Sequence, residues 1–361
     1  MKKNRIHNFS AGPAQLPLEV LEEVQQEFLN YNEIGSSIIE ISHRDKTFIE
    51  VANDCENQVR KLLNLNDDFE IIFMQGGATL QFSLIPMNFA SKDGIVSYAE
   101  VGSWSSKAIN EAKKICDVDV CFSSKASNFT EIDSFNKWNI HQDSQLIHYC
   151  KNETIQGISI KEDPDFDRPV FVDMSSCLFS EEINFSKYDF IYACAQKNFG
   201  ASGLTLLLVK KDLLTKANPN LPNMLNINSH NEAESMLNTP NTFAMYLAAK
   251  IFKWYADQGG VSEMEKRAKS KSTTLYRLID ESNFYLNPVN KQQRSNCNVV
   301  FTIHDESLEK KFLEQAEEFG FMYLKGHRSV GGMRASIYNS MEETSVNELA
   351  EFMKEFEDKN G

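Results

Sequence analysis

The sequence lacks the features that mark membrane, secreted and zinc-binding proteins. Its 361 residues contain no apolar run near the ~20 residues that a membrane-spanning helix needs. The first residues, MKKNRIHNFSAGP, are basic, but no apolar segment follows them, so a secretory signal is not expected. The seven cysteines include no CxxC pair, and the seven histidines include no HxxxH or HExxH spacing. These absences predict reduced thiols, a cytoplasmic protein and no metal site.

Basic residues are few relative to acidic ones. Lys and Arg number 37 against 51 Asp and Glu, which gives a formal net charge of −14 and argues against broad binding to nucleic-acid phosphates. An anionic ligand must therefore be held by a few local cations. Apolar residues make up 42% and charged residues 24% of the chain, as in ordinary globular proteins, and the length suggests roughly two domains.

Short apolar runs alternate with helical stretches between residues 70 and 209. Runs of this length, separated by crossover segments, are typical of a mostly parallel sheet with helices on both faces. The expected strands are 70–74, 94–99, 118–122, 145–150, 169–174, 189–195 and 204–209. The predicted fold class is therefore α/β, with a large domain over residues 16–262.

Helical patterns frame this region. Apolar residues at helical spacing predict a helix over 48–63 that packs on the sheet. After the Gly259-Gly260 break, Ser262-x-x-Glu265 matches a capping box, and it predicts the start of a helix that runs to about residue 279.

The elements beyond this break have a different character. They are a strand at 298–303, a helix with Leu308, Phe312, Ala316 and Phe319 on one face, a strand at 333–337 and a last helix that opens at the capping box Ser345-x-x-Glu348. Residues 1–15 and 263–361 are therefore predicted to form a smaller α+β domain.

Lys197 and Asp173 are the first candidates for chemistry. Lys197 lies in a tight turn between two strand-like runs, where a rigid, partly desolvated lysine has a lowered pKa and one fixed approach to an aldehyde, as a Schiff-base lysine needs. On spacing alone, a surface lysine is the commoner case. Asp173 ends an apolar strand, where open α/β sheets place ligand groups. Its carboxylate is suited to pair with a pyridinium nitrogen. Asp is also a common residue at the N-terminal cap of a helix.

The turn Gly76-Gly77-Ala78-Thr79 follows one predicted strand and precedes a predicted helix. Small residues at such a turn free backbone N–H groups to bind a phosphate, and the helix dipole adds to this attraction. The same residues are also typical of any tight turn.

Eight segments, in order along nearly the whole chain, resemble signatures of phosphoserine aminotransferase, a family that uses pyridoxal 5'-phosphate (PLP) and has the aspartate-aminotransferase fold. They are NFSAGPAQLP (8–17), ISHRDKTF (41–48), VGSWSSKA (101–108), NETIQG (152–157), VDMSS (172–176), AQKNFGASG (195–203), LNTPNTF (237–243) and GHRSVGGMRASIYN (326–339). Many ordered segments at matching distances are far more specific than one motif. The resemblance implies PLP as cofactor and a homodimer with sites at its interface.

The resemblance also implies roles for the cofactor-binding residues. Lys197 resembles the lysine that forms the Schiff base with PLP and later carries the proton between the amino-acid Cα and the cofactor. Asp173 resembles the partner of the pyridinium nitrogen, Trp104 the residue that stacks on the ring, and Thr154 the partner of the 3′-oxygen. Phosphate or ring contacts are implied for Ala78, Thr79 and Gln196, and for Asn238 and Thr239 from the neighbouring subunit.

Substrate binding is implied for a small set of polar and cationic residues. Arg334 resembles the arginine whose bidentate fork binds the α-carboxylate. The pairs His43-Arg44 and His327-Arg328, the second expected from the other subunit, resemble the set that binds the substrate phosphate or the glutamate side chain. Either pair alone is typical of solvated charges. Ser10 resembles a glutamate contact and is also a natural turn residue.

The implied reaction transfers an amino group between L-glutamate and 3-phosphohydroxypyruvate, giving O-phospho-L-serine and 2-oxoglutarate. Members of the family also act on the phosphorylated hydroxythreonine substrate of pyridoxine biosynthesis. An alanine or serine:glyoxylate aminotransferase of the same fold remains an alternative, as does a catalytically silent binding protein. A cysteine desulfurase is disfavoured because Cys297 begins an apolar strand, and redox sensitivity at Cys177 or Cys194 is less favoured than their burial.

Three positions or turns depart from the family pattern. The lysine turn has residues 200–203 as Gly-Ala-Ser-Gly, where Gly-Pro-Ala-Gly is usual. Leu237 and Asn241 flank the Asn-Thr-Pro motif where Tyr and Pro are usual. Asp45 follows the first His-Arg pair, where its carboxylate would weaken the field for an anion. None of these changes removes a predicted catalytic group.

Overall fold

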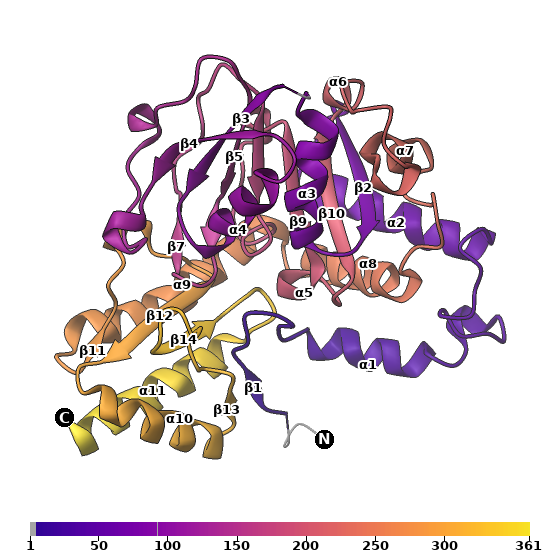
Figure 1. Ribbon diagram of the computed structural model, residues 1–361. Coiled ribbons are helices and arrows are strands. Elements are labelled where there is room, and N and C mark those ends of the chain that lie inside the picture. Colours follow the sequence, from indigo (N-terminus) through magenta and orange to yellow (C-terminus); the bar gives the residue numbers. More distant parts are fainter. Residues whose placement is uncertain (1–4, 92) are drawn as a thin grey trace.

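A seven-stranded sheet forms the centre of the protein in the computed structural model, which describes residues 5–91 and 93–361 (Figure 1). In spatial order the strands are β2 (Phe69–Gln75), β10 (Leu204–Lys210), β9 (Phe190–Cys194), β8 (Val170–Asp173), β5 (Ser144–Cys150), β3 (Ile95–Glu100) and β4 (Asp117–Ser123). Strand β10 runs antiparallel to both neighbours, and the other pairs are parallel. The predicted α/β class is confirmed, and all seven predicted strands are present.

Both faces of this sheet are buried because side chains alternate along each strand. In β10, Leu206 and Leu208 join one apolar cluster, whereas Leu207 and Val209 join another on the opposite face. The first cluster includes residues of α1 (Leu18–Glu27), α2 (Lys46–Leu62) and α8 (Thr242–Asp257). The second includes residues of α3 (Ala78–Phe89), α4 (Ser103–Ala112), α6 (Lys211–Leu214) and α7 (Ile227–Glu232). The helix predicted over 48–63 corresponds to α2.

A second group of elements packs below the sheet as Figure 1 is drawn. It comprises α9 (Gly260–Glu281), β11 (Tyr285–Leu286), β12 (Asn298–Ile303), α10 (Glu309–Glu318), β13 (Phe321–Met322), β14 (Met333–Ser336) and α11 (Glu343–Asn360). The short strand β1 (His7–Asn8) pairs with β13, and Phe9 joins the apolar cluster of this group. We therefore propose the domain division expected from the sequence, with residues 1–15 and 263–361 in the smaller domain. Residues 1–4 of that range lie outside the described residues.

Both predicted capping boxes are wrong as helix starts. Helix α9 begins at Gly260, two residues before Ser262. The carboxylate of Glu265 instead accepts the backbone N–H of Glu182 at 2.8 Å. A partner distant in sequence has replaced the local cap.

The same replacement occurs at α11, which begins at Glu343 rather than at Ser345. The Ser345 hydroxyl contacts His7 Nδ1 at 2.8 Å, and Glu348 lies 3.2 Å from His7 Nε2. These side chains therefore fix the N-terminal segment to α11. In α10, Phe312 is buried as expected, but Phe319 is 63% exposed because the helix ends at the preceding residue.

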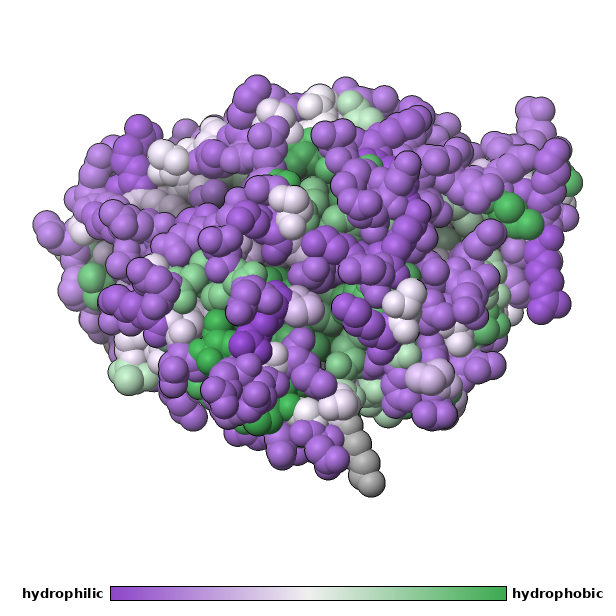
Figure 2. All heavy atoms as spheres, turned by 90° about the horizontal axis from the view of Figure 1, so that it is seen from above, coloured by the Kyte–Doolittle hydropathy of each residue, from purple (hydrophilic) through white to green (hydrophobic). Residues whose placement is uncertain are grey.

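The surface is mainly polar. Figure 2 shows the face above the sheet covered largely by hydrophilic residues, with small apolar areas between them. Among the described residues, none of the helices has both the length and the apolar composition that crossing a bilayer requires.

Lys271 of α9 anchors the chain that follows β14. The side chain is only 2% exposed, and its Nζ donates to the carbonyl oxygens of Tyr338 at 2.7 Å and Met341 at 2.8 Å. Burial lowers the pKa of Lys271 to about 8, because desolvation disfavours the ammonium form.

This buried lysine predicts a stability difference that depends on pH. An unfolded lysine holds its proton up to about pH 10.4, so unfolding takes up a proton between about pH 8 and 10, and the Lys271 contribution to the free energy of unfolding rises with pH in that range. We expect the stability of wild type relative to Lys271→Met to increase from pH 7 to pH 9.5 in urea denaturation. A difference that stays constant with pH would contradict this assignment.

Candidate active site

Lys197 lies where the two groups of elements meet, on the short helix α5 (Ala195–Asn198) between β9 and β10 (Figure 1). Its Nζ donates to Thr154 Oγ1 at 2.8 Å and lies 5.2 Å from the centroid of the Trp104 ring. Thr154 follows β6 (Asn152–Glu153), which forms a small hairpin with β7 (Ile158–Ser159). The fold thus brings together three predicted residues from three separate segments.

The pKa of Lys197 is raised, which corrects the expectation of a lowered value. Burial is the largest single effect and lowers the pKa, but Cys194, Tyr338 and Asp173 together outweigh it. Desolvation alone predicts a lowered pKa, and the acidic groups around the turn reverse this effect. A lysine with a raised pKa must lose a proton before it can attack an aldehyde.

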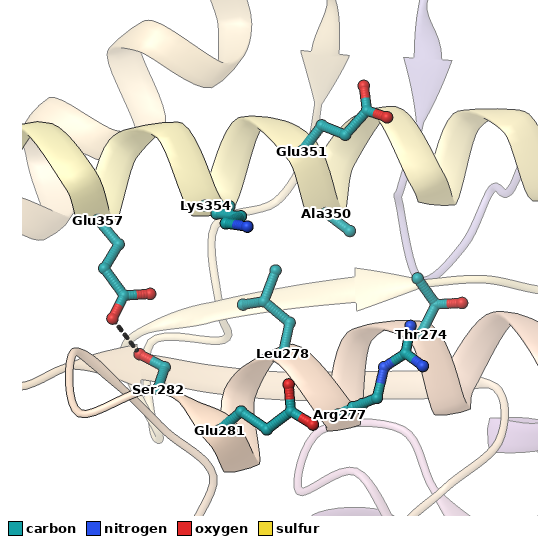
Figure 3. Close-up of a pocket in the computed structure, with 9 residues that line it drawn as sticks. All are labelled: Thr274, Arg277, Leu278, Glu281, Ser282, Ala350, Glu351, Lys354 and Glu357. Carbon is teal, nitrogen blue, oxygen red and sulfur yellow. Dashed lines mark hydrogen bonds between the residues drawn. The ribbon is translucent and has the colours of Figure 1, made fainter.

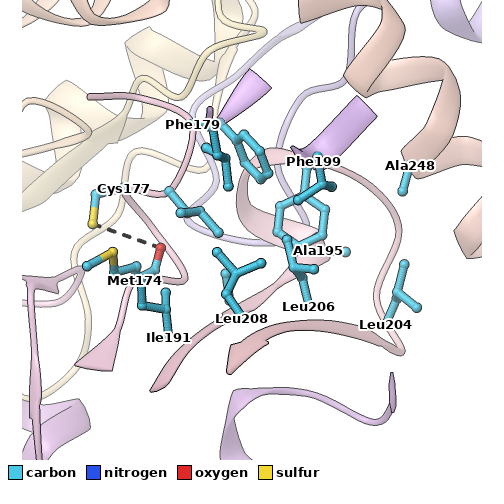
Figure 4. Close-up of a cluster of buried hydrophobic side chains, with 14 of the residues drawn as sticks. Met174, Cys177, Phe179, Ile191, Ala195, Phe199, Leu204, Leu206, Leu208 and Ala248 are labelled. Carbon is cyan, nitrogen blue, oxygen red and sulfur yellow. Dashed lines mark hydrogen bonds between the residues drawn. The ribbon is translucent and has the colours of Figure 1, made fainter. Parts of the chain in front are cut away.

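Packing and hydrogen bonds hold the backbone of the lysine turn in place. Ala195 and Phe199, on either side of Lys197, belong to the apolar cluster shown in Figure 4. Asn198 Nδ2 donates to Leu178 O at 2.8 Å, and Asn198 Oδ1 accepts the backbone N–H of Asn339 at 3.1 Å. Such anchoring restricts the directions that the lysine side chain can take.

Asp173 ends β8 and is buried. Its Oδ1 accepts the backbone N–H of Ser175 at 2.8 Å, which is the capping role left open by the sequence. The register of the sheet pairs Asp173 with Cys150 on β5 and Tyr192 on β9. Its carboxylate also contributes to the raised pKa of Lys197, so the two groups face one site.

The Gly-Gly-Ala-Thr turn lies beside the lysine turn. Gly76 has a φ of +103°, which favours glycine, and its N–H donates to Gly203 O at 3.3 Å. Helix α3 begins at Ala78, and no side chain caps its N-terminus. Ala78 is half-buried, Thr79 is exposed, and the first N–H groups of α3 are positioned to bind an anion.

Asn238 and Thr239 reach the same end of the sheet. The Thr239 carbonyl accepts a hydrogen bond from Gln75 Nε2, at the end of β2, and both predicted residues are exposed. Asn241, one of the departures from the family pattern, caps α8 by accepting the N–H of Ala244 at 3.1 Å. This departure therefore has a local structural role.

Arg334 on β14 has a buried Nε with no hydrogen-bond partner among the described residues. Burial lowers the pKa of its guanidinium, and nearby Tyr338 opposes this effect. Trp104 Nε1 and Gln196 Oε1 are likewise buried without partners in that part of the chain. Because unpaired buried polar groups are costly, these three atoms fit a polar ligand bound beside Lys197.

Tyr338 is a residue of this site that the sequence argument missed. Its hydroxyl donates to Ala11 O at 2.9 Å, and burial raises its pKa, whereas Lys197 and Arg334 lower it. The charges of both Lys197 and Arg334 therefore act on Tyr338. Its place in the segment GHRSVGGMRASIYN was the available signal.

His327 and Arg328 lie with Arg334 of their own chain. The His327 pKa is lowered by burial first and then by Lys107, Arg334 and Arg328. The expectation that this pair serves the site of the other subunit stays a prediction. Lys107, a further cation not singled out from the sequence, has its Nζ 4.1 Å from the centroid of the Trp104 ring.

His43 and Arg44 occupy the turn before α2, where the Arg44 N–H donates to Ser42 Oγ at 3.2 Å. None of the hydrogen bonds found among the described residues joins either side chain to the Lys197 turn. Asp45 caps α2 by accepting the Thr47 N–H at 2.8 Å, and this bond lowers the Asp45 pKa. The third departure is thus explained by a helix cap.

The N-terminal segment that contains Ser10 packs against the lysine turn. The Ser10 hydroxyl accepts the N–H of Gly12 at 3.2 Å, and the Ala14 N–H donates to Gln196 O at 2.9 Å. Ser10 therefore acts as a turn residue within reach of the segment that carries Lys197.

The cysteines of this region are buried rather than poised to react. Cys177, Cys194 and Cys297 are free and buried, and burial raises the pKa of Cys297 to about 11. Burial also raises the pKa of Cys177 and of Cys194. Thiols of this kind are poor nucleophiles, which argues against the desulfurase and redox alternatives.

A groove between α9 and α11 lies outside this site (Figure 3). Arg277, Glu281 and Lys354 project along its walls, and Ser282 donates to Glu357 at 2.8 Å across one end. None of the predicted site residues lines it.

The fold and the site define the class of the protein. The profile of the aminotransferase class-V family matches residues 6–349. The chain therefore belongs to the class-V aminotransferases.

Comparison with individual proteins narrows the class to the phosphoserine aminotransferases. The chain is 45% identical to the phosphoserine aminotransferase of Vesicomyosocius okutanii over 357 residues, 99% of each chain. The phosphoserine aminotransferase structure from Bacillus circulans subsp. alkalophilus matches with a TM-score of 0.97 at 40% identity over 99% of each chain. The PLP-bound enzyme from Trichomonas vaginalis matches with a TM-score of 0.93 at 37% identity over 97% of this chain and 100% of that one. The predicted family, aminotransferase activity and PLP cofactor are confirmed.

The alternative of a glyoxylate-type enzyme rests on fold alone. An alanine–glyoxylate aminotransferase from Nostoc matches with a TM-score of 0.80 but is only 16% identical, over 99% of this chain and 96% of that one. Such a match shows a shared architecture and carries no argument about substrate.

Proposed function

We propose that the protein transfers an amino group between L-glutamate and 3-phosphohydroxypyruvate, giving 2-oxoglutarate and O-phospho-L-serine. The observation that carries the proposal is the meeting of Lys197, Thr154 and Trp104. The buried Nε of Arg334, which has no hydrogen-bond partner within the described part of the chain, supports it. The phosphoserine aminotransferases to which the chain is similar support the same substrates.

The cofactor-binding roles follow from the positions of the residues. PLP supplies an electron sink when bound. Asp173 would hold its pyridinium nitrogen, Thr154 its 3′-oxygen and Trp104 one face of its ring. The N–H groups at Ala78 and Thr79, together with Gln196, would bind its phosphate or ring. Lys197 would hold the cofactor covalently and move the proton at the substrate Cα.

The substrate-binding roles use the cations around the lysine turn. The Arg334 fork would bind the α-carboxylate, which satisfies its free Nε. His43 and Arg44, with His327 and Arg328 supplied by the other subunit, would bind the distal phosphate or carboxylate. One cationic pocket of this kind accepts both phosphoserine and glutamate, because both carry an anionic group at the far end.

We also propose that the active unit is a homodimer. The segment 29–49 exposes four large aliphatic side chains, at Leu29, Ile34, Ile39 and Ile49, and Leu29 is 82% exposed. His43 and Arg44 lie in the same segment. A second copy packed on this segment would cover the apolar side chains and bring its own His327 and Arg328 to His43 and Arg44. Asn238 and Thr239, which are exposed, would reach the partner's cofactor phosphate.

Replacing Leu29 with glutamate is expected to weaken the dimer, because a charge would replace a large apolar side chain at the contact. Light scattering should show monomer at concentrations where the wild type is dimeric, and phosphoserine turnover should fall with the dimer fraction. Leu286→Glu, an exposed leucine of the smaller domain, is the control. Unchanged dimer and activity in Leu29→Glu would contradict the proposed interface.

Cytoplasmic location and action on the phosphorylated hydroxythreonine substrate of pyridoxine biosynthesis are parts of the same proposal. The seven free cysteines suit a reducing compartment. The phosphorylated hydroxythreonine carries the same α-carboxylate and terminal phosphate as phosphoserine, so the same cations would bind it.

A steady-state assay tests the proposed reaction against its alternatives. PLP-loaded protein is given L-glutamate with 3-phosphohydroxypyruvate, or L-alanine with glyoxylate, and the oxo-acid product is measured. We expect turnover of the first pair and little of the second. The reverse preference would support the glyoxylate-type enzyme, and no turnover of either would support the silent binding protein.

A further inference from the structure

The N-terminus of α4, the helix that carries Trp104, is capped by a different segment of the chain. Glu153 Oε2 accepts the Trp104 N–H at 2.9 Å, and Glu153 Oε1 accepts the Ser105 N–H at 2.7 Å and the Ser105 hydroxyl at 2.8 Å. Gln156 Oε1 accepts the Ser103 N–H at 3.1 Å. Side chains next to the β6–β7 hairpin therefore satisfy the first N–H groups of α4.

Glu153 is a carboxylate in a fully buried place. It is only 1% exposed, and burial raises its pKa, although hydrogen bonds from Ser105 and Trp104 lower it. A buried carboxyl is costly unless it is hydrogen-bonded, and the positive end of the α4 dipole favours a carboxylate at this position. An apolar side chain at this position would avoid the cost of burying a carboxyl group. The presence of Glu153 therefore indicates a specific role for its carboxylate.

The position of Glu153 links the two sides of the site. The next residue, Thr154, binds Lys197 Nζ at 2.8 Å, while the Glu153 side chain holds the backbone of Trp104, whose ring centroid lies 5.2 Å from the same Nζ. One dipeptide thus contacts both the lysine and the helix that carries the ring. Gly102 leaves room for the carboxylate, because a Cβ at residue 102 would lie 2.4 Å from Glu153 Cδ.

We propose that Glu153 is a positioning residue that fixes the Trp104 ring at the cofactor face by capping α4. The inference rests on the proposed function in one respect, namely that Trp104 stacks on the PLP ring. Glu153 is assigned no contact with substrate or cofactor in this proposal. It acts through Trp104, and this dependence is what distinguishes it from a residue that only stabilises the fold.

The test is a double-mutant cycle on PLP affinity, measured by titrating the cofactor-free full-length chain and following the induced visible circular dichroism. Glu153→Gln keeps the shape but loses the carboxylate, and we expect PLP to bind about fivefold more weakly, the factor that corresponds to ~1 kcal/mol for a helix cap. In a Trp104→Ala background the same change should have little further effect, because the ring that it positions is absent.

Two further variants keep the test decisive. Gly102→Ala displaces the carboxylate from the other side and should reproduce the loss if Glu153→Gln folds poorly. Asp189→Asn is the matched control, because the Asp189 carboxylate also accepts a backbone N–H, that of Val170, at 2.7 Å. Asp189 precedes β9 and therefore lies at the end of this strand opposite Lys197. It should leave the PLP affinity and the dichroism band unchanged.

The outcomes separate the inference from the function on which it rests. The positioning role would be overturned if Glu153→Gln and Gly102→Ala both bind PLP with wild-type affinity. It would also be overturned if Glu153→Gln weakens PLP binding equally with and without Trp104. Either result would leave the proposed aminotransferase function intact. Failure of the wild-type chain to bind PLP would instead overturn the proposed function.

Discussion

Replacing Lys197 with alanine is expected to reduce amino transfer from phosphoserine by about 10⁴-fold or more, since the variant loses both the covalent anchor and the proton carrier. The Lys197 Nζ donates to the Thr154 hydroxyl. Lys107 also lies over the Trp104 ring, but none of its hydrogen bonds among the described residues reaches Thr154. The measurement is a single-turnover assay with excess enzyme, which separates the chemical step from product release.

Lys210→Ala is the matched control for this experiment. Lys210 is the last residue of β10, at the end of the strand opposite the lysine turn, and it pairs with Asp189 at 3.0 Å. Its loss should lower stability slightly and leave turnover unchanged. Substantial turnover by Lys197→Ala, with the control active, would show that another group performs the chemistry.

Replacing Arg334 with lysine is expected to lower kcat/KM for O-phospho-L-serine by about 100-fold, which corresponds to ~3 kcal/mol for hydrogen bonds to a charged group. Lysine keeps the positive charge but cannot bind a carboxylate through two parallel N–H groups. The buried Arg334 Nε, which has no hydrogen-bond partner in residues 5–91 and 93–361, is the donor that the substrate would satisfy. Initial-rate kinetics over a range of phosphoserine concentrations measure the effect, which should fall mainly on KM.

Arg277→Lys provides the comparison, because Arg277 lines the groove between α9 and α11 away from the site. It should change neither kcat nor KM. If Arg334→Lys retains wild-type KM, the α-carboxylate is bound elsewhere and the assignment of Arg334 is wrong.

The sequence predicted the central sheet well because its strands are buried on both faces and read as continuous apolar runs. Lys197 and Asp173 were predictable for a related reason, since the ends of such strands place ligand groups at one edge of the sheet. The helix starts at residues 260 and 343 were missed. There, the capping side chains are bound by partners distant in sequence, and a local pattern does not contain that information.

The pKa values of the site residues were less predictable from the sequence than the identity of those residues. The raised pKa of Lys197 depends on Cys194, three residues before it, and on Tyr338 and Asp173. The last two come from separate segments and meet the lysine only in the folded chain. The same reason explains why Tyr338 and Lys107 were missed. The roles of Asp45 and Asn241 as helix caps likewise became visible only once the helix boundaries were known.

We expect one site to combine a cofactor-binding lysine with a pocket for a phosphorylated amino acid. The most direct test mixes PLP-loaded protein with O-phospho-L-serine alone and follows the visible absorption of the bound cofactor, with L-serine and L-alanine as controls. Rapid loss of the band with phosphoserine only is the predicted result. A band that responds to alanine but not to phosphoserine would contradict the account.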